Sequence, residues 1–244
     1  MRLRRLLPLA LGLACAAPAR ATTVTFRQGD AGYASTYDTF VSQNAPNGNS
    51  GGAAVIRWDG DDPNGSGKDD LTLLRFDGII GSGAGQVPSG AQITSATLTY
   101  YVSDTGDTAE IHYAAVAWTE SSTFNSYCGT GCDSTQIGAL VGSASAPALG
   151  VTTADVTSSI QAWANGAQNL GWIFVPTGPG GAEASSSENA NQVNRPLLTV
   201  VYGEGPPPSN VVRQPYLQLA TPTSVTVVWS TESATDSVVH YGTT

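Results

Sequence analysis

The chain has 244 residues, of which 41% are hydrophobic and only 12% are charged. Asp and Glu total 19 against 10 Lys and Arg, so the formal net charge is −9 at pH 7. This balance repels nucleic acids, anionic lipids and polyanionic glycans, and it excludes the basic patch that nucleic-acid binding needs. The 28 Gly residues, together with this apolar content, are typical of a turn-rich β protein and not of a disordered chain.

The chain opens with the pattern of a secretory signal peptide over residues 1–21. Three Arg within residues 2–5 precede an apolar run over 6–17, and the Ala-Arg-Ala at 19–21 is the small-x-small pattern that signal peptidase cleaves. The apolar run is too short to span a bilayer, and no later run reaches spanning length. We therefore expect no transmembrane segment.

Cleavage of this leader would give a product that begins at Thr22 and is secreted, either extracellular or periplasmic. Cleavage removes four Arg and no acidic residue, which leaves six basic and 19 acidic residues and a net charge of −13. A lipoprotein anchored through Cys15 is the alternative, although Gly12 stands where lipoprotein signals carry Leu.

Two cysteines follow the leader, Cys128 and Cys132, in the sequence YCGTGCD. Because an exported protein meets oxidising conditions, a disulfide between them is the first interpretation. A metal-binding pair is the alternative, but no second Cys or His pair would complete a tetrahedral site.

Residues 22–203 are predicted to form short strands separated by turns of Gly, Pro, Asn, Asp and Ser. The stretch 93–102 alternates most clearly, because its even-numbered residues from Ala96 to Val102 are apolar and its odd-numbered neighbours from Ser95 to Thr99 are polar. Further strands are predicted at 71–76, 109–118, 170–176 and 197–202.

One short helix is predicted within residues 155–166, where Val156, Ile160 and Trp163 recur at helical spacing. Thr157 or Ser158 is expected to cap its start, Ser158 with Gln161 to form a capping box, and Gly166 to end it. Many short strands with a single helix indicate an all-β sandwich of two sheets, most simply a jelly roll.

The acidic loop 58–70 is the densest cluster of metal-type ligands in the sequence. Its hard oxygen donors suit Ca²⁺, although Pro63 breaks the helix-loop-helix calcium pattern. A solvated turn in which the same residues serve turn geometry is the alternative. The candidate calcium ligands, in a structural role, are Asp59, Asp61, Asp62, Asn64, Asp69 and Asp70.

Aromatic side chains are the other candidates for binding, because sugar-binding modules stack aromatic faces against pyranose rings. The candidates are Trp58, Tyr101, Tyr127 and Trp118, and burial in a core is the alternative for each. Tyr101 is the one most expected to be exposed, since it lies opposite the apolar face of its strand.

No catalytic constellation is predicted in the chain. A two-metal hydrolytic site needs several His and Asp ligands, whereas only His112 and His240 are present. A Ser-His-acid triad would need one of the same histidines, and no nucleophile elbow occurs. Arg75 and Asp77, at i and i+2, are predicted to form a fold-stabilising pair.

A Pro-rich linker is predicted at 204–210, where three prolines follow one another. Beyond it, residues 211–244 contain three strand-like runs, the opening pattern of an immunoglobulin-like or fibronectin-like sandwich. Such a sandwich needs about seven strands, so we expect the sequence to be incomplete at its end.

The segment 213–242 resembles the fibronectin-like N-terminal domain of purple acid phosphatases. The matching residues are Pro215, Tyr216, Leu217, Gln218, Trp229, Asp236, Ser237, Tyr241 and Gly242. In that family the domain precedes a metallophosphoesterase domain with a two-metal site. The resemblance implies that such an enzyme follows this chain and that its metals bind there and not here.

Residues 33–202 resemble the DNRLRE-type jelly-roll modules, which include alginate-binding carbohydrate modules. The likeness rests on six blocks in order, among them YDTFV (37–41), LLRFDGI (73–79), WTESSTFN (118–125) and SSENANQVNRPLLTVVY (186–202). Two departures matter: Phe124 stands where members carry Trp, and the basic residues around LLRFD are reduced to Arg75. With the negative charge of the chain, this argues against alginate as the ligand.

These observations predict a non-catalytic N-terminal region of an exported phosphatase, whose β-sandwich binds a polysaccharide or a cell-surface glycan. A free-standing secreted carbohydrate-binding module or an adhesin-like structural module is the alternative.

Overall fold

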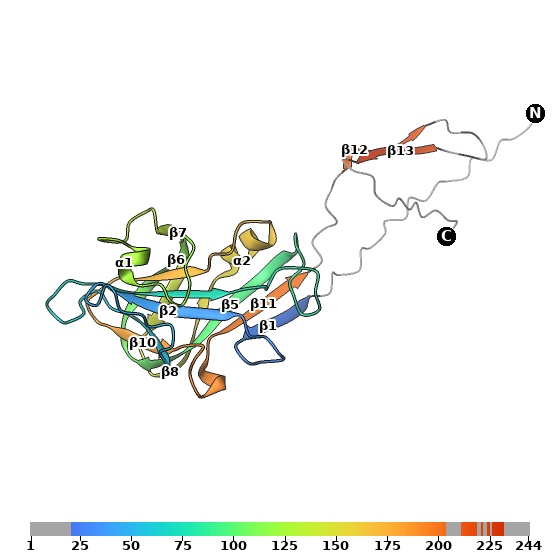
Figure 1. Cartoon of the computed structure of the whole chain (residues 1–244). Helices are drawn as coiled ribbons and strands as arrows, with labels where there is room; N and C mark the ends of the chain where they lie inside the picture. Colours follow the sequence, from blue (N-terminus) through green and yellow to red (C-terminus); the bar gives the residue numbers. More distant parts are fainter. Residues whose placement is uncertain (1–20, 204–210, 219–220, 222–223, 225, 232–244) are drawn as a thin grey trace, which may run out of the picture. The chain divides into compact units, whose positions relative to one another are not determined.

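The computed structural model describes residues 21–203, 211–218, 221, 224 and 226–231 (Figure 1). Residues 21–203 belong to one compact unit. In the second unit, strands β12 (Val211–Gln218) and β13 (Thr226–Thr231) pair in antiparallel fashion, as the first two predicted runs there suggest. The predicted linker, the third predicted run and nearly all of the leader lie outside the described residues.

The larger unit is a sandwich of two antiparallel sheets, as predicted. One sheet has the order β1-β11-β5-β10-β3, with β8 also paired to β5, and the other has the order β2-β4-β9-β6-β7. Its strands are β1 (Thr22–Arg27), β2 (Thr36–Ser42), β3 (Val55–Trp58), β4 (Asp70–Phe76), β5 (Gln92–Asp104), β6 (Gly106–Ala114), β7 (Ile137–Ala146), β8 (Gly150–Asp155), β9 (Trp172–Pro176), β10 (Ala182–Ser185) and β11 (Leu197–Gly203). Its helices are α1 (Phe124–Tyr127), α2 (Thr157–Ala164) and the 3-10 turn η1 (Gln192–Asn194).

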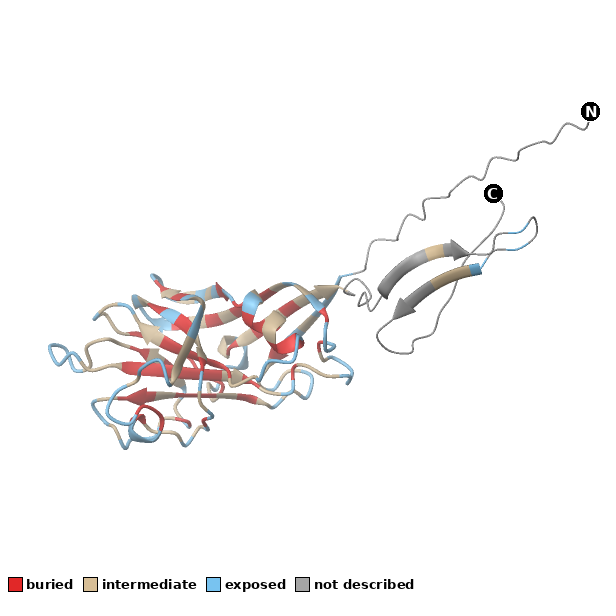
Figure 2. Cartoon of the chain, turned by 90° about the horizontal axis from the view of Figure 1, so that it is seen from above, coloured by how far each residue is buried: buried red, intermediate tan, exposed pale blue. Residues whose placement is uncertain are grey.

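The main core lies between the two sheets (Figure 2). Strand β5 contributes the predicted alternation, since Ala96, Leu98, Tyr100 and Val102 are all buried. Strand β9 of the other sheet contributes Trp172 and Phe174 to the same core, and these residues are 0% and 1% exposed. The period-2 pattern of the sequence therefore identifies the inner face of β5 correctly.

A second core covers the outer face of the β2-β4-β9-β6-β7 sheet. On β4, Leu74 and Phe76 belong to the main core, whereas Leu71 and Leu73 point the other way. The segment 115–136 folds over this outer face and buries Trp118, Phe124 and Tyr127 against it. We call this the covering segment.

The predicted disulfide closes the covering segment. Cys128 and Cys132 are bonded, with their Cα atoms 4.4 Å apart, and Cys128 is buried in the second core. Upstream of the bond, Thr123 and Ser126 form a reciprocal capping box at the start of α1. The long loop thus has its own tertiary structure.

Helix α2 lies where it was predicted, and Val156, Ile160 and Trp163 are all buried. Gly166 follows its end with a φ of +98°, and its N–H donates to the carbonyl of Trp163. No described helix is long and apolar enough to cross a membrane.

The predicted N-terminal cap of α2 is wrong. Val156 is the N-cap and makes no side-chain capping bond. The Thr157 hydroxyl instead accepts from the Ala96 N–H at 2.8 Å, and the Gln161 side chain bonds Ile93 N and Ala91 O. These side chains join the helix to β5 and the residues just before it, because packing on the sheet offers them stronger partners than the helix end.

Candidate functional site

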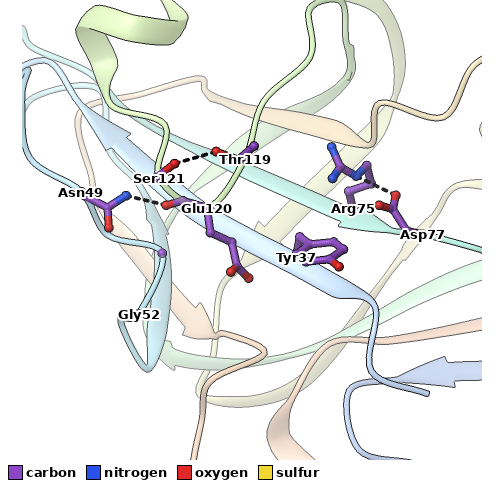
Figure 3. Close-up of a pocket in the computed structure, with 9 residues that line it drawn as sticks. Tyr37, Asn49, Gly52, Arg75, Asp77, Thr119, Glu120 and Ser121 are labelled. Carbon is purple, nitrogen blue, oxygen red and sulfur yellow. Dashed lines mark hydrogen bonds and ion pairs between the residues drawn. The ribbon is translucent and has the colours of Figure 1, made fainter. Parts of the chain in front are cut away.

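An open hollow of about 720 Å³ lies where the start of the covering segment meets the edge strand β2 (Figure 3). We call it the Tyr37 groove. It is lined by Tyr37, Asn49, Gly51, Gly52, Arg75, Asp77, Thr119, Glu120 and Ser121. Its walls therefore come from β2, from β4 and the turn after it, from the loop before β3, and from the covering segment.

Tyr37 places a half-buried aromatic ring in the groove. Alternate residues of β2 share its face, and Val41 on that face is fully buried beneath the covering segment. Tyr37 lies at the margin of this cover and stays partly accessible. An aromatic ring with a hydroxyl offers a ligand both an apolar face and a polar group.

The Arg75 side chain is fixed by an ion pair, a hydrogen bond and two aromatic rings. Its Nε lies 2.7 Å from Asp77 Oδ1, and its Nη1 donates to the Trp118 carbonyl at 3.2 Å. The guanidinium carbon lies 5.3 Å from the centroid of the Tyr37 ring and 4.9 Å from that of Trp118. The predicted Arg75–Asp77 pair is confirmed, and the guanidinium holds Tyr37 and the covering segment together.

The polar rim of the groove is fixed by one contact between two loops and by one within the covering segment. The Asn49 amide donates to the Glu120 carbonyl at 2.5 Å, and the Thr119 and Ser121 hydroxyls are 2.8 Å apart. A Cβ at Gly51 would overlap the backbone of Glu120, so glycine is needed for this approach. The rim is thus built before any ligand arrives.

Acidic side chains lie around and behind the groove. Burial raises the pKa of Glu120, the negative charge of Glu188 adds to this, and the Asp38 backbone N–H and Arg75 oppose it. Asp38 is 1% exposed, and burial followed by the charge of Glu188 raises its pKa well above the ordinary value. Ser187 links the two acids: its N–H donates to Asp38 Oδ2 and its hydroxyl to Glu188 Oε1.

Three of the four predicted sugar-stacking residues are buried, so that prediction is wrong for them. Trp58 is 0% exposed, packs on Tyr100 and Phe174, and donates its indole N–H to Asp107 O.

Trp118 and Tyr127 are both 4% exposed in the second core. Trp118 donates its indole N–H to the Leu170 carbonyl, and Tyr127 its hydroxyl to that of Gln136. Tyr101, the fourth candidate, is half-buried on β5 beside Val151 of β8, away from the groove. Its role in binding stays a prediction.

The predicted calcium loop is organised by its own backbone. Asp61 accepts hydrogen bonds from Gly65 N at 2.6 Å and Gly67 N at 2.5 Å, which lower its pKa. Asp59 in turn accepts from Asp61 N at 2.8 Å. Asn64 is exposed, in the turn that these contacts close.

Two of the remaining acids of this loop, Asp62 and Asp70, pair with Arg57. Its Nη2 lies 3.0 Å from Asp62 Oδ2 and its Nε 2.5 Å from Asp70 Oδ2. Burial and the charge of Asp59 raise the pKa of Asp69. In the described part of the chain, no group of three or more His, Cys, Asp or Glu side chains is arranged to hold a metal. Calcium binding by this loop stays a prediction.

The sequence reasoning missed Tyr37 and Glu120 as site residues. Both lie in the blocks YDTFV and WTESSTFN, which indicated family likeness but not a binding site. The signal that could have found Tyr37 is its position at the start of the YDTFV run, which forms the edge strand β2 and was not among the predicted strands.

Residues 30–202 match the family model of carbohydrate-binding module family 96. The chain belongs to this family. The match spans more than half of the sequence and includes every residue that lines the Tyr37 groove. It confirms the predicted likeness to carbohydrate-binding modules, whereas the likeness of residues 213–242 to purple acid phosphatases stays a prediction. A search of curated proteins finds no match.

Proposed function

We propose that the family-96 module binds its glycan in the Tyr37 groove. The observation that carries this is the meeting of a partly accessible aromatic ring with a rim of fixed polar groups in one hollow of about 720 Å³. Glycan sites combine these two features, because the sugar offers C–H groups to a ring and hydroxyls to donors and acceptors. The other predicted aromatics are buried or lie elsewhere.

We also propose that the module is exported and is the non-catalytic front part of a metal-dependent phosphatase of the purple acid phosphatase type. The leader pattern over residues 1–21 supports export, and the phosphatase-like residues between 213 and 242 support the second part. A module that holds an enzyme on a glycan surface raises the local concentration of the enzyme there. Continuation of the reading frame into a His- and Asp-rich domain would support this, and a stop codon after residue 244 would refute it.

The groove is tested by affinity electrophoresis through gels that contain neutral or charged polysaccharides. Tyr37→Ala should weaken binding about 5- to 10-fold, since an aromatic contact contributes about 1 kcal/mol. Tyr37→Phe, which keeps the ring, should retain most of the affinity. Tyr101→Ala is the matched control and should bind like the wild type.

The opposite result would contradict the proposal. If Tyr101→Ala weakened binding and Tyr37→Ala did not, the ligand would lie on the outer face of the β5 sheet. If no polysaccharide retarded the wild type, the adhesin-like structural module would be favoured. Thermal unfolding of each variant separates lost binding from lost folding.

A further inference from the structure

The positive charge of the Tyr37 groove is already neutralised within the protein. Arg75 is 14% exposed in its side chain and is engaged by Asp77, by the Trp118 carbonyl and by two aromatic rings. An incoming carboxylate would have to replace Asp77 or share a guanidinium that has little free surface. The groove therefore offers an anionic ligand no vacant cation.

Its negative charge, by contrast, is in excess. Figure 3 shows the Glu120 side chain beside Tyr37, with its carboxylate free of the dashed contacts that join the other residues drawn. Among the residues that the structure describes, no basic side chain forms an ion pair with Glu120. Once Arg75 and Asp77 cancel each other, Glu120 sets the charge of the groove.

One further acid, Glu188, reinforces the negative charge of Glu120 from behind the strand. Asp38 is buried beside Glu188, and its raised pKa favours its neutral form, so it does not add to this negative charge. The raised pKa of Glu120 reflects burial first and the charge of Glu188 second. A cation in the groove would stabilise the partly buried Glu120 carboxylate and offset the repulsion from Glu188, whereas an anion would increase the repulsion.

We propose that the Tyr37 groove recognises glycans that carry free amino groups, with the sugar ring on Tyr37 and its ammonium group on the Glu120 carboxylate. This rests on the proposed function, and it names the class of glycan that the site prefers. The net charge of −9 acts in the same direction, because it attracts a polycationic glycan and repels a polyuronate at long range. Asn49, Thr119 and Ser121 then supply the polar contacts to hydroxyls.

The test uses three oligosaccharide probes of equal length: a β-1,4-glucosamine oligomer, its fully N-acetylated counterpart and an oligouronate. Calorimetry at about pH 6 should give a Kd for the amino oligomer about tenfold lower than for the acetylated one, with no measurable binding of the uronate. Added salt should weaken only the amino oligomer, since an ammonium–carboxylate contact is screened.

Glu120→Gln should abolish the preference for the amino oligomer and leave affinity for the acetylated one within about twofold. Glu110→Gln is the matched control, because Glu110 lies on β6 beside His112 and does not line the groove. It should keep the tenfold preference. Rescue of the preference by Glu120→Asp would further support a charge contact at this position.

The outcomes separate the charge assignment from the proposed function. If Tyr37→Ala weakens every glycan but the acetylated oligomer or the uronate binds best, the groove is the site and the amino-sugar assignment is wrong. If the amino oligomer binds best and neither Tyr37→Ala nor Glu120→Gln alters its binding, both proposals are wrong for this groove. If Glu120→Gln weakens binding of the amino oligomer and Tyr37→Ala does not, the charge contact is supported and the stacking of the sugar on Tyr37 is wrong.

Discussion

Asp70 provides a test of how this fold handles a buried charge. Its side chain is 0% exposed, and Arg57 Nε lies 2.5 Å away. Burial raises the pKa of Asp70 to about 6, against the opposing effects of Ser42 and Arg57, and the charges of Asp62 and Asp59 raise it further. Replacing Asp70 with Asn removes the titration and keeps the shape of the protonated acid.

The sign and size of the effect follow from linkage. The ordinary pKa of Asp is 3.8, so between about pH 4 and pH 6 the folded state holds more protons on residue 70 than the unfolded state does. The contribution of Asp70 to stability is therefore fully present below pH 4 and is lost as the pH rises through about 6. The loss amounts to roughly 3 kcal/mol. The Asp70→Asn variant lacks this loss.

Urea unfolding of wild type and Asp70→Asn at four values between about pH 4 and 7 measures the difference directly. The free energy of unfolding of the variant, relative to the wild type, should rise by roughly 3 kcal/mol across this range. Asp61→Asn is the control, because hydrogen bonds lower the pKa of Asp61 below its ordinary value of 3.8, so its stability relative to the wild type should be nearly constant between about pH 4 and 7 and should rise only as the pH falls below about 4. A difference that is flat or falls for Asp70→Asn would show that the Arg57 contact outweighs burial, and the reasoning would be refuted.

Two further predictions concern the covering segment and the sheet beneath it. Joint replacement of Cys128 and Cys132 by Ala should lower the free energy of unfolding by about 2 kcal/mol, from the short loop that the bond closes, and the midpoint by about 4–8 °C. Reductant should lower the wild-type midpoint equally and leave the variant unchanged, and coincident melting curves without reductant would contradict this. Gly171→Ala should lower the free energy of unfolding by about 2–5 kcal/mol, because φ is +76° and a Cβ would overlap Leu74 O. Gly150→Ala should lower it by only about 1–2 kcal/mol, because φ is +111° but the space around the Cβ is open. Equal costs in chemical denaturation would refute the steric part of this argument.

Local pattern sufficed to predict the sandwich and much of its core. The alternation along β5 and the helical spacing from Val156 to Trp163 each report which side of one element is apolar, and each was placed correctly. The disulfide was equally accessible, since residues four apart need no knowledge of the fold to meet. These features depend on neighbours in the sequence.

The site could not be predicted in the same way, because it depends on contacts between distant segments. For Trp58 and Trp118 the sequence leaves exposure and burial both open, whereas in the fold each is buried and donates its indole N–H to the carbonyl of a distant residue, Asp107 or Leu170. The capping of α2 failed for the same reason, since the side chain of Gln161 bonds to Ala91 and Ile93 some 70 residues earlier. The sequence alone does not show whether a side chain will bond to such a distant partner or to the nearby end of its own helix.

The edge position of β2 explains why an aromatic ring and buried acids come together at one margin. Successive residues of a strand point to opposite faces, so Tyr37 and Asp38 would be separated by the sheet if β2 lay in its interior. Because β2 is an edge strand, the segment that carries Glu120 can pass over the edge of the sheet and contact both faces. Glu120 lines the groove with Tyr37 and also lies near the backbone N–H of Asp38. Strand β2 also keeps an unpaired side that such a segment must cover. The groove is therefore a consequence of how this edge is protected, and changes in the covering segment should alter ligand preference more readily than changes in the sheets.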